Sequence, residues 1–96
     1  MSGIFAEMQP LTAAQRRALK SKAQLLEPHL KVGQQGVGEA FLASVDTELS
    51  RHGLIKIRFV HFQEEKKALC EKIAAATESA HLQTVGHVAI FYRPSC

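Results

Sequence analysis

The 96-residue sequence has no tryptophan, only two cysteines and no hydrophobic run long enough to cross a bilayer, which takes about 20 apolar residues. Cys70 and Cys96 form neither a CxxC pair nor a disulfide framework, and Cys70 lies among apolar residues that predict a buried thiol. The N-terminus lacks the basic and apolar regions of a secretory signal. We therefore expect a cytoplasmic protein with reduced cysteines and no membrane partner.

Patterns that would indicate a catalytic or metal centre are also missing. The five histidines show neither HxxxH nor HExxH spacing, and none is grouped with a cysteine. Asp46 and Glu48 lie two positions apart on an expected helix, so their carboxylates do not face each other. No nucleophile has an evident base beside it. The sequence therefore predicts no enzyme, no cofactor and no metal.

The net charge is a modest +3, but it is unevenly distributed. Residues 12–38 carry a net charge of +4 and residues 51–62 a net charge of +3, whereas the acids gather in residues 39–50 and 63–79. A basic flank beside an acidic remainder suggests a surface for a polyanion such as nucleic acid. Ordinary solvated surface charge is the alternative interpretation.

Hydrophobic periodicity predicts three helices. The first follows the capping-box pair Thr12 and Gln15 and ends at Pro28, the second covers residues 39–51, and the third covers residues 64–79. The side chains expected to face the core are Leu19, Ala23, Leu26, Phe41, Val45, Leu49, Leu69, Ile73 and Ala76.

Short strands are expected at residues 30–32, 81–85 and 88–92. A longer one is expected in the run LIKIRFVHF, where apolar residues alternate with Lys56 and Arg58 on an accessible basic face. The resulting order is α-β-α-β-α-β-β. This order predicts a single compact α/β domain with a mixed four-stranded sheet packed with helices.

Three glycines lie between the first strand and the second helix, in the stretch LKVGQQGVGEA. The spacing GxxGxG is neither a Walker A motif nor the GxGxxG of dinucleotide folds. A GxxG corner that leads into a helix resembles the loop with which KH domains clamp a nucleic-acid backbone. A purely structural turn remains the alternative.

The aromatic residues indicate which kind of nucleic-acid contact to expect. Phe41, Phe59 and Phe91 lie in apolar patterns and are expected in the core, and Tyr92 is expected at the sheet edge. Because few aromatic rings are left for the surface, base stacking on a sheet face is not expected. Contact with the backbone and the shape of RNA fits better.

Three separated segments carry a resemblance to a known family: LTAAQRRALKSKAQLLEPHLKVGQQGV, GLIKIRF and VGHVAIFYRPS. Together they resemble the CRM domain (chloroplast RNA splicing and ribosome maturation), in its stand-alone bacterial YhbY-like form. The likeness covers residues 11–95 and leaves residues 1–10 as a flexible N-terminal tail. It implies a fold similar to the C-terminal domain of translation initiation factor 3. It also implies RNA binding without catalysis, on precursors of the large ribosomal subunit.

The resemblance and the charge pattern together give a set of candidate RNA-binding residues. The family often has a lysine inside the loop, as GKxG, where this chain has two glutamines. It also commonly has a threonine as the following helix cap, where this chain has Gly38. The candidates are Lys20, Lys22, Lys31, Gly33, Gln34, Gln35, Gly36, Arg51, Lys56, Arg58 and Arg93.

The sequence therefore predicts a monomeric module that binds structured ribosomal RNA, rather than DNA, and assists assembly of the large ribosomal subunit. The alternative is a protein-interaction domain that docks through its acidic second helix. Glu39, Asp46 and Glu48 are the residues that motivate it.

Overall fold

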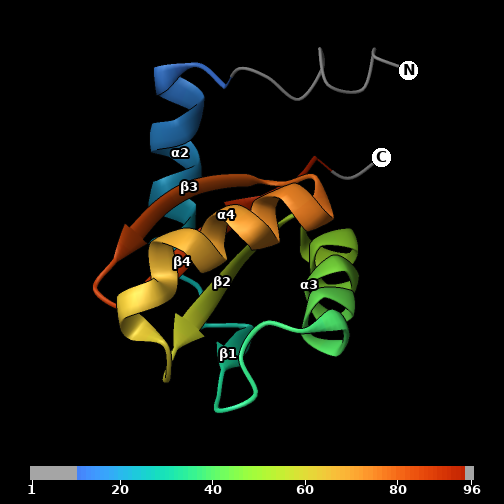
Figure 1. Ribbon diagram of the computed structural model, residues 1–96. Helices are drawn as coiled ribbons and strands as arrows, with labels where there is room; N and C mark the ends of the chain where they lie inside the picture. Colours follow the sequence, from blue (N-terminus) through green and yellow to red (C-terminus); the bar gives the residue numbers. More distant parts are fainter. Residues whose placement is uncertain (1–10, 95–96) are drawn as a thin grey trace.

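The computed structural model describes residues 11–94 (Figure 1). The elements, in chain order, are α2 (Ala13–Gln24), β1 (Leu30–Val32), α3 (Glu39–His52), β2 (Leu54–Phe59), the short 3-10 helix η1 (Gln63–Glu65), α4 (Lys66–Thr77), β3 (Ala80–Val85) and β4 (Val88–Tyr92). The predicted order of helices and strands is confirmed. The tail predicted at residues 1–10, the last position of the predicted domain and Cys96 lie outside the described residues.

The four strands form one mixed sheet in the order β1-β2-β4-β3. β1 runs parallel to β2, whereas β4 is antiparallel to both of its neighbours. Val32 pairs with Phe59, and Leu54 pairs with Tyr92. The segment after β1 therefore lies at the end of the sheet where β2 finishes, and the segment after β4 lies at the opposite end.

One face of the sheet packs against α3 and α4 and forms the main core. Figure 1 shows α4 crossing this face and α3 standing beside it. Alternate β2 residues point into this layer, as the sequence predicted, because successive side chains of a strand face opposite sides. Its fully buried members include Val45, Leu49, Ile55, Ile57, Phe59, Ile73 and Phe91.

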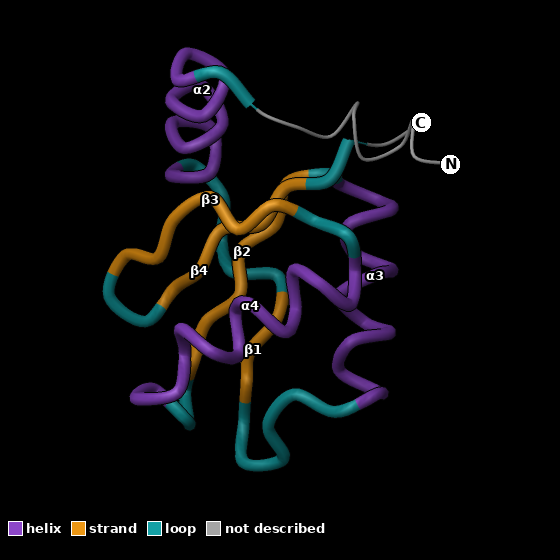
Figure 2. The backbone as a smooth tube through the Cα atoms, turned by 45° about the horizontal axis from the view of Figure 1, so that its top comes forward, coloured by secondary structure: helices purple, strands orange, loops and turns teal. Residues whose placement is uncertain are grey.

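The opposite face packs against α2, which Figure 2 shows at one end of the sheet. A second, smaller core lies there, made by Ala23 with Leu54, Leu82 and Ile90. α2 makes contacts with β2 and β3. The helix does not cover the whole face, because Arg58, at the far end of β2, stays exposed. The sheet is thus fully covered on one side and partly open on the other.

The start of α2 confirms its sequence signal, whereas its end corrects it. Thr12 and Gln15 make both hydrogen bonds of the capping box, at 2.9 and 3.0 Å. The helix ends at Gln24, four positions before Pro28, with Leu25 as its C-cap. Backbone bonds to residues three positions earlier tighten the last turn there.

The inward face of α4 also differs from the prediction. Ala76 is exposed, and Thr77 is buried in its place. Thr77 tolerates burial because its Oγ1 donates to the carbonyl of Ile73 at 2.7 Å. The other two predicted residues, Leu69 and Ile73, do face the core, so the difference is confined to the last turn of α4.

Candidate nucleic-acid interface

The glycine loop is a tight turn whose two glycines serve different purposes. The Gly36 amide donates to the Gly33 carbonyl at 3.1 Å, with Gln34 and Gln35 at the corners. Gly36 has φ +73°, which L-residues rarely adopt, and a Cβ there would lie 3.4 Å from the ring of Phe62. A Cβ at Gly33 would meet nothing within 4 Å. Gly36 is therefore required by the fold, while Gly33 leaves the backbone open to a ligand.

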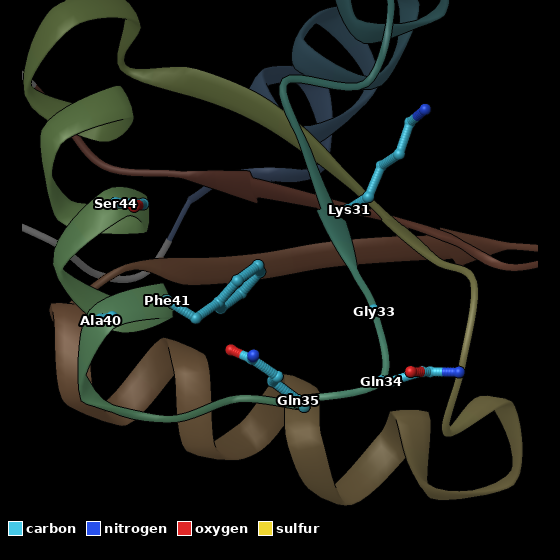
Figure 3. Close-up of a pocket in the computed structure, with 8 residues that line it drawn as sticks. Lys31, Gly33, Gln34, Gln35, Ala40, Phe41 and Ser44 are labelled. Carbon is cyan, nitrogen blue, oxygen red and sulfur yellow. The ribbon is translucent and has the colours of Figure 1, made fainter.

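An open hollow of about 480 Å³ lies between this loop, the edge strand β1 and the start of α3. Figure 3 shows Gln35 reaching toward Phe41, while Gln34 and Lys31 point away from the α3 wall. The hollow is lined by Lys31, Gly33, Gln34, Gln35, Gly36, Ala40, Phe41 and Ser44. Backbone amides and two side-chain amides make it suited to a polar chain rather than to an apolar ligand.

The N-terminus of α3 borders the hollow without a side-chain cap. Gly38 is the N-cap, and no side chain accepts a hydrogen bond from the first turn, as the missing threonine predicted. The first amides of a helix have no partner within the helix, and its N-terminus carries partial positive charge. Glu39, in the first turn, opposes that field. The helix end therefore adds donors to the site but little net positive potential.

Lys31 and Arg58 form an exposed basic pair beside the loop. They are paired across β1 and β2, so both side chains project from the partly open face of the sheet. Within residues 11–94, neither side chain has a hydrogen bond or an ion pair. Val88 and the 60% exposed Val85 continue the same row across β4 and β3. Two unpaired cations thus lie on an open surface directly before the glycine turn.

Lys56 lies on the same face of β2 as Arg58, but its side chain is half-buried rather than freely accessible, and it lines a hollow with Val85 and Val88. Its Nζ donates to the carbonyl of Leu26 at 2.9 Å, and its backbone amide donates to Nδ1 of His29 at 3.2 Å. The side chain is half-buried beneath the end of α2. Its ammonium therefore ties the segment after α2 to β2.

Arg93 and Arg51 lie at the end of the sheet opposite to the loop. Arg93 follows β4, and its guanidinium donates to Asp46, Ser50 and the carbonyl of Thr77. Arg51 lies in the last turn of α3, 3.9 Å from a carboxylate oxygen of Glu48. The fold therefore does not bring these two candidates together with the glycine loop.

Lys20 and Lys22 belong to α2 rather than to the loop's surroundings. Lys22 lines a separate hollow with Leu26, His29, His52 and Leu54, at the end where β1 and β2 begin. The loop follows the other end of β1. The predicted flanking of the loop by the first helix is therefore not seen.

A pair of histidine rings lies beside Lys22. The rings of His29 and His52 are 4.8 Å apart, and His52 lies 3.3 Å from the carboxylate of Glu48. Burial, and then the neighbouring His52, lower the pKa of His29. His29 is thus held neutral, which matches its role as a hydrogen-bond acceptor for the amide of Lys56.

The acidic face that motivated a protein-interaction domain is partly neutralised within the chain. Asp46 is bound by Arg93 at 2.7 Å, and Glu48 lies near Arg51 and His52. Of the three acids, Glu39 alone has no such partner among the described residues. The face offers less free negative charge than the sequence suggested.

Two other kinds of site are absent from residues 11–94. These residues contain no cluster of three or more side chains able to hold a metal ion. None of the helices described is long and apolar enough to cross a membrane.

Cys70 is fully buried, as predicted, and burial raises the pKa of its thiol, which keeps it protonated.

Phe62, which the sequence patterns did not single out, lies directly beside the loop. It is 41% exposed, and its ring lies next to Gly36. No sequence pattern could have placed it, because β2 ends at Phe59 and the alternation of strand side chains does not extend to Phe62, whose backbone is left-handed.

One protein-family model matches this chain, and proteins of similar sequence are named as RNA-binding proteins. The family model of the CRS1 / YhbY (CRM) domain matches residues 11–93. An RNA-binding protein of Haemophilus influenzae is 36% identical over 92% of this chain and 90% of its own length. A probable RNA-binding protein of Methanocaldococcus jannaschii is 37% identical over 88% of this chain and 64% of its own length.

The solved structures agree with this assignment. The solution structure of a hypothetical protein from Staphylococcus aureus matches with a TM-score of 0.76 and 32% identity, over 91% of this chain and 92% of the other. The chain belongs to the CRS1 / YhbY (CRM) domain family.

Proposed function

We propose that this protein binds RNA, without catalysis, through the glycine loop and the basic pair beside it. The RNA is structured ribosomal RNA of the large subunit or its precursor, and the protein acts as a monomer in the cytoplasm during assembly of that subunit. Relatives named as RNA-binding proteins support the class of ligand.

One observation in particular supports this proposed site. Lys31 and Arg58 have no protein partner in residues 11–94, and they lie side by side before an open Gly33. An RNA phosphate binds where a cation can neutralise it and where the RNA backbone can come close to the protein. Both conditions are met beside Gly33. Gln34 and Gln35 supply amide donors where a lysine is absent, so affinity depends more on the sheet cations.

Charge reversals at matched positions test this placement. Lys31→Glu and Arg51→Glu each lower the net charge of +3 by two, but only Lys31 lies beside the loop. We expect Lys31→Glu and Arg58→Glu to weaken binding of labelled large-subunit RNA fragments, measured by fluorescence anisotropy. Each should also flatten the slope of log K against log salt by about 0.7 to 0.9 for every phosphate that the variant no longer neutralises.

Arg51→Glu serves as the control and is expected to retain affinity. If it weakens binding as much as Lys31→Glu does, affinity follows net charge and the proposed site is wrong. If the wild-type protein binds no RNA fragment at low salt, RNA binding itself is wrong.

The assembly role needs a separate test in cells. The protein should sediment with precursors of the large subunit, and its loss should cause those precursors to accumulate. Sedimentation with mature small subunits alone would contradict the role in large-subunit assembly and leave RNA binding intact.

A further inference from the structure

The short connection after β2 presents an exposed aromatic ring next to the glycine loop. Four large hydrophobic side chains are exposed in the described residues, and two of them, Val60 at 46% and Phe62 at 41%, belong to this connection. The other described phenylalanine and tyrosine rings are buried or half-buried. Covering exposed apolar surface is favourable by roughly 25 cal/mol per Å², so these two neighbouring side chains would gain from contact with a ligand.

Hydrogen bonds hold this connection against the start of the loop. The amides of Val60 and His61 both donate to the carbonyl of Val32 at 3.1 Å, directly before Gly33. The side chain of Gln63 donates to the carbonyls of Phe59 and Val60. The position of Phe62 is therefore fixed relative to the glycine turn.

The backbone of Phe62 is in a conformation that bulky residues rarely adopt. Its φ and ψ are 60° and 37°, in the left-handed region. Glycine or asparagine would fit this position without the same penalty. Residues held in such conformations gather at ligand-binding sites, so an exposed phenylalanine kept there suggests a role for its ring.

Gly36 makes room for the ring beside the loop. The nearest ring atom, Cε2, lies 3.4 Å from the place that a Cβ of residue 36 would occupy. A larger side chain in the loop would press on the ring. The ring thus borders the turn along which an RNA backbone would run, within reach of a base attached to that backbone.

The charges around Phe62 favour a base over a phosphate. The hollow at this connection is lined by Val60, His61, Phe62, Gln63, Glu64 and Glu65. Its two carboxylates would repel a phosphate, but they accept hydrogen bonds from the amino and imino groups of a nucleobase. An aromatic face, apolar neighbours and acceptors together fit an unpaired base.

We propose that Phe62 stacks on one unpaired nucleobase of the RNA whose backbone lies on the glycine loop. This inference rests on the proposed RNA binding and deepens it, because it assigns a preference for a loop or bulge over a continuous duplex. Bases within a duplex are already stacked and cannot reach a side chain in this way.

A single tryptophan tests the stacking directly. The protein has no tryptophan, so Phe62→Trp introduces the only indole and keeps an aromatic ring at the site. We expect a looped RNA to quench its emission, with the same midpoint as anisotropy measured on the same sample. Leu25→Trp is the matched control, because Leu25 is 86% exposed at the end of α2 and its emission should stay unchanged.

The outcomes separate this inference from the proposed function. Binding by anisotropy without quenching at position 62, or with equal quenching at position 25, overturns the stacking and leaves RNA binding in place. Absence of any binding by the wild type overturns both.

Substitutions by residues with and without a ring give a second test that does not depend on fluorescence. Phe62→Leu keeps an apolar side chain, while Phe62→Tyr keeps the ring. For looped RNA we expect Phe62→Leu to weaken binding by roughly tenfold and Phe62→Tyr to retain it, while duplex affinity stays unchanged for both. Thermal denaturation checks that each variant is folded. Equal affinity of the leucine variant and the wild type for looped RNA would show that the ring serves only packing.

Discussion

Arg93 donates from Nη1 to the carboxylate of Asp46 at 2.7 Å, across 47 positions of the sequence. Its Nη2 donates to the carbonyl of Asp46 and to Ser50, and Nη1 also donates to the carbonyl of Thr77. One guanidinium therefore joins the end of β4 to α3 and to the last turn of α4. Arg93, which the sequence suggested for RNA binding, therefore makes four hydrogen bonds within the fold.

We expect Arg93→Ala to destabilise the protein by about 1–3 kcal/mol, because the variant lacks charge-assisted hydrogen bonds to three residues. For a domain of this size, each kcal/mol lowers the melting temperature by roughly 4–8 °C. Asp46→Asn should cost less, under about 1 kcal/mol, because that carboxylate is 59% exposed. Thermal denaturation by circular dichroism measures both. An Arg93→Ala variant as stable as the wild type would contradict this role.

The two loop glycines should respond differently to alanine. Gly36→Ala should lose about 1–2 kcal/mol of stability, because alanine is strained at φ +73°, although its Cβ would only be in ordinary contact with Phe62. Gly33→Ala should keep the stability of the wild type, because its Cβ meets nothing. Urea denaturation compares the two variants. Equal losses would show that Gly33 is also required by the fold.

Because substitution of Gly33 should leave the fold stable, Gly33 is the better position at which to test contact with RNA. A larger side chain at Gly33, such as Gly33→Val, should weaken RNA binding while the melting temperature stays within a few degrees of the wild type. Loss of binding at Gly36 would be ambiguous, because that variant is also destabilised. Unchanged affinity in a folded Gly33→Val protein would argue against close approach of the RNA backbone.

Lys56 should matter to stability more than to RNA affinity. Lys56→Ala leaves the carbonyl of Leu26 without its donor and should cost about 1–2 kcal/mol. At a temperature where the variant is folded, its RNA affinity should fall less than that of Lys31→Glu. Anisotropy and thermal denaturation on the same preparation separate the two effects. Equal losses of affinity would place Lys56 in the interface after all.

The protein should lose stability as the pH falls below about 6.5, the ordinary pKa of histidine. Burial and the nearby His52 lower the pKa of His29 in the folded state. The unfolded chain therefore takes up a proton at higher pH than the folded one does, so acid favours unfolding. Stability from this group is complete above the unfolded pKa and decreases as the pH falls toward the folded one.

His29→Asn separates this effect from other titrations. Asparagine keeps an oxygen able to accept from the amide of Lys56 but cannot be protonated in this range. Melting temperatures between pH 8 and pH 5 should fall less for His29→Asn than for the wild type. His61→Asn, at an exposed position, should follow the wild type. Parallel curves for all three proteins would contradict the role of His29.

Local patterns in the chain were enough to predict the element order, most of the core and the glycine turn. The capping box at Thr12 and Gln15, the alternation of Ile55 and Ile57, and the positive φ at Gly36 all depend on short-range physics. Each signal acts within a few residues, so it can be read without knowing how the elements pack.

Long-range packing settled which cations share a surface, and no local pattern could have done so. Lys31 and Arg58 are neighbours because β1 pairs with β2 in one particular register, whereas the ammonium of Lys56, two positions earlier on β2, donates to the carbonyl of Leu26 after α2. The guanidinium of Arg93 donates hydrogen bonds to the carboxylate of Asp46 in α3 and to the carbonyl of Thr77 in α4. Charge and spacing identify residues able to bind a phosphate. The packing of distant segments decides which of these residues keep free hydrogen-bond donors. It also decides which side chains, such as that of Phe62, lie beside them.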